Sequence, residues 1–137
     1  MKQFVVGAQA SFSKKISASD VATFAEICGD QNPLHLDETY AKQTRFGARI
    51  AHGAFAFGLI SAALGTELPG NGTVYMSQSI KFVKPIYFYD TITATVEITA
   101  LRADKGIITL KTDCANQRGD KIAEGEAVVF HPDAKTQ

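Results

Sequence analysis

The second half of the chain alternates polar and apolar residues in a pattern typical of β-strands. Across Thr91–Ala100 every second residue is apolar, which predicts a strand with one buried face in an antiparallel sheet. Three similar stretches are predicted as strands: Thr73–Phe82, Gly106–Asn116 and Lys121–Phe130. Glycine-containing turns at residues 104–106 and 117–120 separate the last three strands, as in β-hairpins.

The first half of the chain carries helical signals instead. Ser17 followed by Asp20 is a helix-start pattern. The apolar residues after it are spaced i, i+3, i+4 and i+7: Val21, Phe24, Ala25 and Cys28. This spacing predicts a helix that ends at Gly29, in which Cys28 is a buried, small apolar side chain.

Three shorter segments follow this helix. Asp30–Asp37 is predicted to be a loop or turn, because Pro33 disfavours a helical conformation at the residue before it. Asp37 is then expected to cap a short helix that runs to Lys42. The residues from Thr44 to Ile50 are predicted to be irregular, with Gly47 among them.

The segment Ala54–Gly65 is apolar on every side. A helix with this pattern has to be surrounded by protein. Short helices, one enclosed helix and a run of long strands together predict an α+β architecture, in which a curved antiparallel sheet wraps around a central helix. This arrangement resembles the hot-dog fold, and one domain over residues 1–137 is expected.

Composition and charge narrow the class of protein. The chain has 137 residues, of which 45% are hydrophobic and 20% are charged, as in ordinary globular domains. Fourteen Lys and Arg balance fourteen Asp and Glu, so a nucleic-acid or membrane-surface partner is not expected. The longest apolar stretch is shorter than the ~20 residues that span a bilayer. Because Met1–Gly7 lacks the apolar core of a signal peptide, a cytoplasmic location is expected.

Asp30 and His35 are the first candidates for chemistry. They flank a turn that contains Pro33, so both side chains can converge on one point. A carboxylate and an imidazole titrate on either side of the range in which acid–base catalysis near neutrality operates. The alternative, from the residues alone, is that Asp30 caps the turn and His35 is a surface residue.

His52 and Gly53 precede the enclosed helix and form a second candidate site. Backbone N–H groups at a helix start lack partners and carry a partial positive charge, so Gly53 can hold a developing oxyanion. Alternatively, Gly53 only permits tight entry into the core. Ser61 lies two turns further on, where its hydroxyl can equally bond to its own helix. No metal site is expected, because the three histidines (His35, His52 and His131) lack ligand spacing.

The segment Asp30–Asp37, followed by Ile50–Gly53, resembles the hydratase-2 motif of MaoC-like (R)-specific enoyl-CoA hydratases, in particular the single-domain, polyhydroxyalkanoate-supplying type. The resemblance implies that Asp30 and His35 are a catalytic dyad and that the Gly53 N–H holds the thioester oxygen. It implies supporting roles for three further residues: Asn32, His52 and Ser61.

The resemblance also implies the reaction, a reversible syn addition of water to trans-2-enoyl-CoA that yields (R)-3-hydroxyacyl-CoA without a cofactor. Since the chain has no net charge, coenzyme A is expected to bind local cations, with Lys81, Lys84 and Arg102 as candidates. The acyl chain is expected near three residues of the enclosed helix: Phe55, Phe57 and Leu59. A homodimer is expected, because pairing of two sheets hides an open edge strand.

Other readings stay open at this point. A 3-hydroxyacyl-acyl-carrier-protein dehydratase would use the same dyad in reverse. An acyl-CoA thioesterase of this fold should carry a carboxylate on the central helix, and Ala54–Gly65 contains none. A non-catalytic acyl-CoA-binding module would bind the thioester without converting it.

Overall fold

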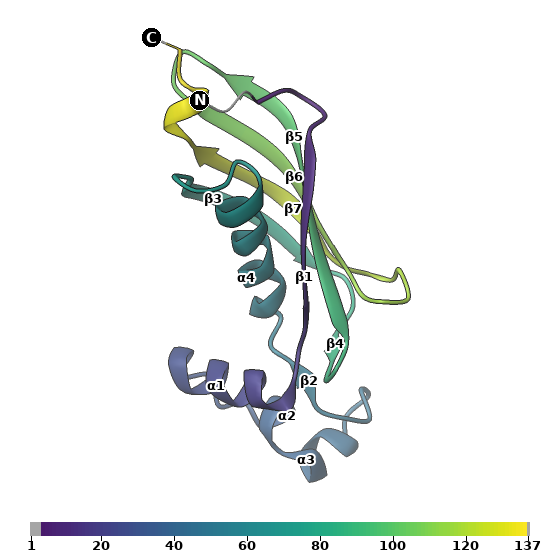
Figure 1. Ribbon diagram of the computed structural model, residues 1–137. Coiled ribbons are helices and arrows are strands. Elements are labelled where there is room, and N and C mark those ends of the chain that lie inside the picture. Colours follow the sequence, from purple (N-terminus) through teal and green to yellow (C-terminus); the bar gives the residue numbers. More distant parts are fainter. Residues whose placement is uncertain (1–3, 137) are drawn as a thin grey trace.

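The computed structural model describes residues 4–136, so residues 1–3, the start of the N-terminal segment considered above, lie outside it. A five-stranded antiparallel sheet has the order β1-β5-β6-β7-β3 (Figure 1). The bounds of these strands are β1 Gln9–Lys15, β3 Val74–Phe82, β5 Thr91–Arg102, β6 Ile107–Ala115 and β7 Lys121–Phe130. The four strands predicted from the sequence are confirmed, and both hairpin turns lie where expected.

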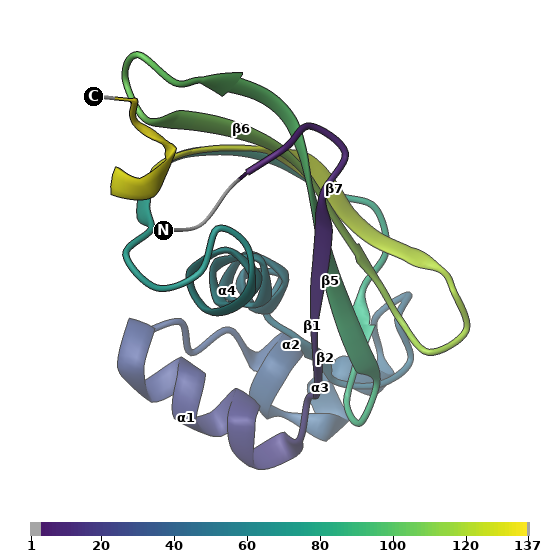
Figure 2. The ribbon, with the colours of Figure 1, turned by 45° about the horizontal axis from the view of Figure 1, so that its top comes forward.

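The sheet curves around one helix, α4 (Ala54–Ala62), as Figure 2 shows. A short π-helical segment, Ala63–Glu67, continues α4. The alternation in β5 places Ile92, Val96 and their apolar neighbours on the inner face with no solvent exposure. These side chains and α4 form one hydrophobic core, so the predicted hot-dog arrangement is confirmed.

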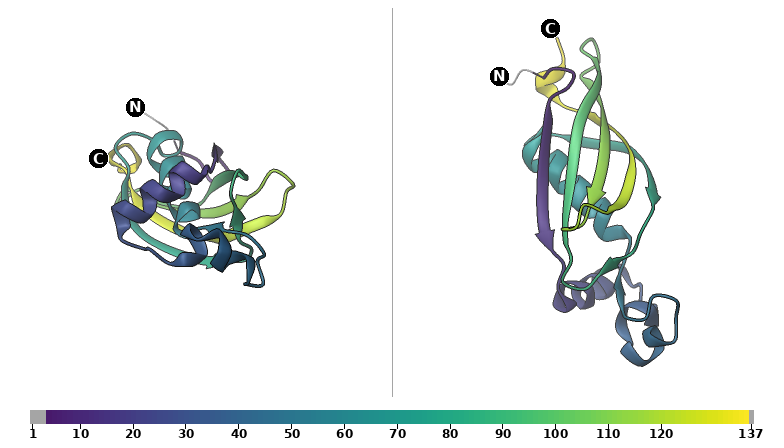
Figure 3. Two further views of the ribbon diagram at one scale, coloured as in Figure 1. Left: turned by 90° about the horizontal axis from the view of Figure 1, so that it is seen from below. Right: turned by 90° about the vertical axis from the view of Figure 1, so that its right-hand side faces the viewer.

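Helices α1 (Ala18–Cys28), α2 (Pro33–Leu36) and α3 (Glu38–Lys42) lie together beyond one end of the sheet (Figure 3). Ser17 and Asp20 form a reciprocal capping box at the start of α1. Gly29 ends α1 with a positive φ of 84°, a conformation that glycine adopts without a steric penalty. A two-stranded pair, β2 (Ile50–Ala51) with β4 (Ile86–Tyr87), joins this layer to the sheet.

The structure differs from the sequence predictions in several places. Strand β1 was not predicted, because its mostly polar residues lie at a sheet edge and give a weak apolar pattern. Cys28 is exposed, not buried, because only Val21 and Ala25 of the α1 stripe reach the core. The buried cysteine is Cys114, and burial raises the pKa of its thiol to about 12.

The surroundings of α4 also differ from the prediction. Ala56, Leu59 and Ile60 are buried as expected, but Phe57 is 41% exposed. One side of the helix is therefore uncovered in a single copy of the chain. No helix within residues 4–136 is long and apolar enough to cross a membrane, and the cytoplasmic location stays a prediction.

Candidate active site

His35 is held by a single helical turn. Asn32 caps α2 by accepting the Leu34 N–H at 3.0 Å, and Pro33 occupies the first helical position, where its missing N–H has no consequence. The segment predicted as a loop is therefore a short helix. The imidazole is 8% exposed, and its Nδ1 lies 2.7 Å from the backbone oxygen of Ile50. Because that oxygen only accepts, Nδ1 carries the proton, and the Nε2 of a neutral ring is left as an acceptor.

Asp30 directly follows Gly29, the residue that caps the C-terminus of α1. Its Oδ1 accepts the backbone N–H of Asn32 at 3.1 Å, and half of its side chain is exposed to solvent. One carboxylate oxygen of Asp30 and one ring nitrogen each of His35 and His52 all lie within 4.8 Å of one another. The fold therefore brings the two residues of the predicted dyad together.

His52 lies against both residues of the dyad. Its ring stacks on His35 with a centroid distance of 3.9 Å and an interplanar angle of 29°. Its Nε2 lies 3.1 Å from the backbone oxygen of Asp30. Burial, together with the neighbouring His35, lowers the pKa of His52 below the usual value of a histidine, against the opposing effect of its bond to Asp30. His52 is therefore neutral near pH 7.

The sequence predicted no metal site, because the spacing of these residues matches no metal motif. The geometry is also a poor fit to a metal ion. An imidazole binds a metal in the plane of its ring, and two rings stacked 3.9 Å and 29° apart hold their lone pairs in two separate, nearly parallel planes, so the lone pairs do not readily meet at one ion. In addition, His52 Nε2 and His35 Nδ1 already bond to backbone oxygens.

Gly53 is the cap residue of α4 and lines a cavity of about 260 Å³ together with His35. Within residues 4–136, no hydrogen bond uses the Gly53 N–H. A Cβ at this position would lie 3.2 Å from the Phe82 ring, so a side chain here would press on the cavity wall. These features fit a backbone donor that needs close access by a ligand.

Of the predicted supporting residues, Asn32 contacts the dyad, whereas Ser61 does not line this cavity. Asn32 organises the dyad loop through the α2 cap and its N–H bond to Asp30. Ser61 lies on α4, half-buried, and is not among the described residues that line the cavity. A supporting role for Ser61 stays a prediction.

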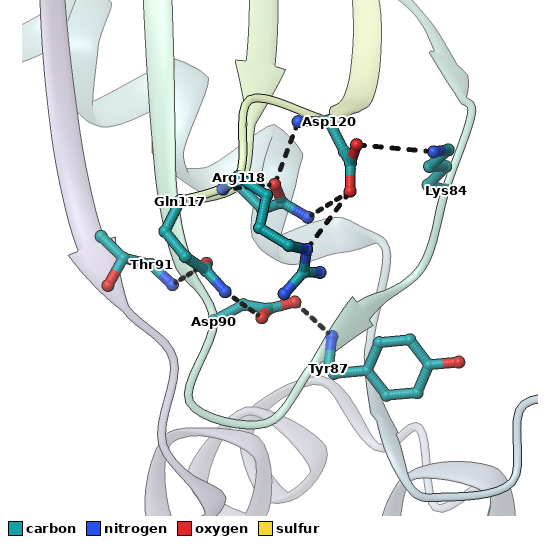
Figure 4. Close-up of polar contacts among 8 residues, drawn as sticks. Lys84, Tyr87, Asp90, Thr91, Gln117, Arg118 and Asp120 are labelled. Atoms are coloured by element: carbon teal, nitrogen blue, oxygen red, sulfur yellow. Dashed lines mark hydrogen bonds and ion pairs between the residues drawn. The ribbon is translucent and has the colours of Figure 1, made fainter.

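A second cavity, of about 480 Å³, adjoins the first and shares part of its wall, including Arg45, Phe46 and Lys84. Three cations and one carboxylate line it: Arg45, Lys84, Arg118 and Asp120. Asp120 lies between Lys84, at 3.7 Å, and Arg118, at 3.4 Å (Figure 4). Its hydrogen bond to Asn116, together with these cations, lowers the pKa of the Asp120 carboxyl.

Two of the three cations proposed to bind coenzyme A lie elsewhere. Arg102 bonds to Asp104 in the β5–β6 hairpin, at the end of the sheet opposite α1–α3 (Figure 1). Lys81 lies opposite Glu124 in the register of β3 and β7 and is not among the described residues that line either cavity. Of the three, the structure brings only Lys84 to the site. Arg45 and Arg118 were missed, because only the fold brings an irregular segment and a hairpin turn together.

Comparison with known proteins agrees with this geometry. Residues 4–117 match the profile of the family described as "MaoC like domain". The chain belongs to the MaoC-like family.

Two curated relatives of this MaoC-like chain are named (R)-specific enoyl-CoA hydratase. The one from Rhodospirillum rubrum is 48% identical over 126 residues, which are 92% of this chain and 87% of the relative. The one from Aeromonas caviae is 46% identical over 127 residues, which are 93% of this chain and 95% of the relative. The solved structure of the A. caviae (R)-hydratase involved in PHA biosynthesis matches with a TM-score of 0.92 at 45% identity. It covers 96% of this chain and 100% of its own.

The lowered pKa of His52 leads to a prediction for the MaoC-like chain. Below about pH 6.5 an unfolded histidine binds a proton that the native His52 does not. The native state therefore loses stability relative to the unfolded state as the pH falls. We expect the free energy of unfolding of the wild type, minus that of His52→Gln, to decrease by up to about 1.4 kcal/mol per pH unit below about pH 6.5. Urea unfolding at several pH values measures this difference, and parallel pH profiles for the two proteins would contradict it.

Proposed function

We propose that this protein is an (R)-specific enoyl-CoA hydratase, a hydro-lyase that adds water reversibly to trans-2-enoyl-CoA. The observation that carries the proposal is the convergence of Asp30 and His35, within 4.8 Å, at a cavity that His35 and Gly53 line. Relatives at 46–48% identity bear this activity in their names.

The reaction requires a base for the attacking water and an acid for the adjacent carbon. The Ile50 oxygen fixes the proton of His35 on Nδ1, so Nε2 is free to accept a hydrogen bond from a water molecule. That water can also donate to the Asp30 carboxylate. Its hydroxyl oxygen bonds to C3, one of its protons passes to the dyad, and the dyad delivers a proton to C2 on the same face.

The thioester oxygen needs stabilisation while the bond between C2 and C3 accepts the nucleophile. At that stage the carbonyl becomes enolate-like, with negative charge on oxygen. The unpartnered Gly53 N–H, at the positive end of α4, supplies a donor in a fixed position. One such donor typically contributes about 3 kcal/mol to transition-state stabilisation. The reaction needs no cofactor.

The second cavity gives a place for the nucleotide end of coenzyme A. It adjoins the catalytic cavity, and Arg45, Lys84 and Arg118 outnumber the single carboxylate Asp120 on its wall. Phosphate groups are recognised by Arg and Lys in such clusters. The thioester would then lie at the dyad while the phosphates lie among these cations. The expected acyl position near Phe55, Phe57 and Leu59 stays a prediction.

We also propose a homodimer formed along β3. This strand is at the edge of the sheet, and Val74, Met76 and Phe82 on it are each more than half exposed. Phe57 of α4, also exposed, stacks on Tyr75 beside the same strand. An apolar edge of this length is otherwise an aggregation site. Pairing with a second copy along β3 would cover these side chains.

A dehydratase acting on acyl-carrier-protein thioesters is a second candidate. A mitochondrial 3-hydroxyacyl-[acyl-carrier-protein] dehydratase from Arabidopsis thaliana is 32% identical over 88% of this chain and 73% of its own. The compact cation cluster favours a small anion over a protein-sized partner. Hydration rates with crotonyl-CoA and with the crotonyl thioester of an acyl carrier protein distinguish the two substrates.

The dyad is tested by Asp30→Asn and His35→Gln. Each should lower the turnover of crotonyl-CoA hydration at least about a hundredfold, the range of general acid–base catalysis, with unchanged circular dichroism. Loss of absorbance at the enoyl band measures the rate, and chiral analysis of the product should give the R isomer. Near-wild-type turnover in either variant would remove the dyad from the mechanism, and binding without turnover by the wild type would indicate a binding module.

The cation cluster is tested by the double variant Lys84→Ala/Arg118→Ala. It should raise the KM for crotonyl-CoA about tenfold with kcat little changed, because the lost contacts bind substrate and transition state equally. The same variant should act normally on crotonyl-pantetheine, which lacks the nucleotide. Arg102→Ala, at the opposite end of the sheet, is the matched control. An equal KM effect on both substrates would contradict the assignment.

The dimer is tested by Met76→Glu, which introduces a charge on the apolar β3 edge. Light scattering after size-exclusion chromatography should give a dimer mass for the wild type and a monomer mass for the variant. Ile27→Glu places the same charge on a residue of α1, not of β3, that is 79% exposed, so that variant should stay dimeric. A monomeric wild type would refute the proposed dimer.

A further inference from the structure

His52 is a buried titratable residue that the proposed reaction does not use. Its side chain is only 3% exposed. It packs edge-on against Phe24, with a centroid distance of 4.9 Å, and stacks on His35 on its other side. It directly precedes Gly53, so it lies next to three groups assigned to the reaction.

Of the two ring nitrogens of His52, Nε2 makes a hydrogen bond, and Nδ1 has no hydrogen-bond partner among the described residues. Because the Asp30 backbone oxygen can only accept, the bond at 3.1 Å requires a proton on Nε2. Nδ1 is then an acceptor, buried and without a hydrogen-bond partner among the described residues. A buried acceptor without a partner costs stability, and a phenyl ring of similar shape would fill the same space without that cost. Packing alone therefore does not explain a histidine here.

The bond from Nε2 is also the tertiary contact that fixes Asp30. Within residues 4–136, the other hydrogen bonds of Asp30 are local: its N–H to Cys28 Sγ at 3.4 Å, and its Oδ1 from Asn32 at 3.1 Å. Half of the Asp30 side chain is in solvent. Local bonds shape the loop, but the bond to His52 ties it to the start of α4 and to the stacked His35.

We propose that His52 is a positioning residue, whose Nε2–H holds the backbone carbonyl of Asp30 and thereby fixes the Asp30 carboxylate at the imidazole of His35. This inference rests on the proposed hydratase function and gives a specific action to His52, for which the family resemblance implied only a supporting role. His52 acts through Asp30 and touches no reacting atom.

Two substitutions separate the hydrogen bond from the ring stacking. His52→Phe keeps an aromatic ring against His35 but has no N–H, whereas His52→Gln keeps an amide N–H near the Nε2 position without a ring. For crotonyl-CoA hydration we expect His52→Phe to lower kcat at least tenfold with KM changed less than twofold. We expect His52→Gln to retain most of the wild-type kcat. If the phenyl ring prevents folding, His52→Asn replaces it, because its shorter amide does not reach the Asp30 oxygen.

His131 offers a matched control. It is also buried, and its Nε2 lies 2.7 Å from the backbone oxygen of Asn71 with an edge contact to Phe4, but it belongs to neither cavity. His131→Phe should lower the melting temperature and leave kcat unchanged. A purely structural role of His52 would give the same result for both histidines.

A double-variant cycle tests whether His52 acts through Asp30. The loss of kcat in Asp30→Asn/His52→Phe should be within about threefold of the loss in Asp30→Asn alone, because residues that act as a unit are not additive. Losses that multiply, or a His52→Phe variant as active as the wild type, would overturn the inference and leave the hydratase function standing. A wild type that does not hydrate crotonyl-CoA would instead overturn the proposed function, and this inference with it.

Discussion

Two hydrogen bonds connect the loop that carries the dyad to the segment that enters α4. His35 donates to the Ile50 oxygen, and His52 donates to the Asp30 oxygen. Each bond links one residue of the dyad to a stretch of chain that the curved sheet and the buried face of α4 hold in place. Without this connection, Asp30 would lie on a solvent-exposed loop and His35 on a short helix, with little to fix the distance between them. The hydrophobic core therefore fixes the relative positions of Asp30 and His35.

The fold also determines where charged side chains gather. The chain as a whole is neutral, and the fold gathers three of its cations at one cavity. Arg45, from the layer of short helices, meets Lys84 and Arg118 from the sheet side at one cavity wall. Asp120 neutralises part of this charge, so an anion that enters competes with a carboxylate already present. The result is a local attraction for phosphate without a long-range field.

The sequence was informative where local chemistry determines structure. The capping box of α1, the alternation in β5 and the motif around Asp30 and His35 are short-range patterns, and all three predicted the right element or the right pairing. The positions of Cys28, Arg118 and His52 depend on how elements pack against one another. A helical stripe indicates which side of α1 is apolar, but not how many of its turns reach the sheet. Likewise, His35 and His52 are seventeen positions apart in the sequence, and their rings stack where His35 bonds to Ile50 in β2, two residues before His52.

The two edges of the sheet differ in a way that bears on how copies of the chain associate. The β3 edge exposes apolar side chains, while β1 at the other edge ends in Lys14 and Lys15. If both edges were adhesive, each added copy would present a new surface for the next, and the sheets would extend into a ribbon. In the proposed dimer each chain uses one edge, so an edge-to-edge pair would leave no β3 surface for a third copy. Association through β3 would therefore stop at the pair, and a higher concentration would not extend it into a fibre.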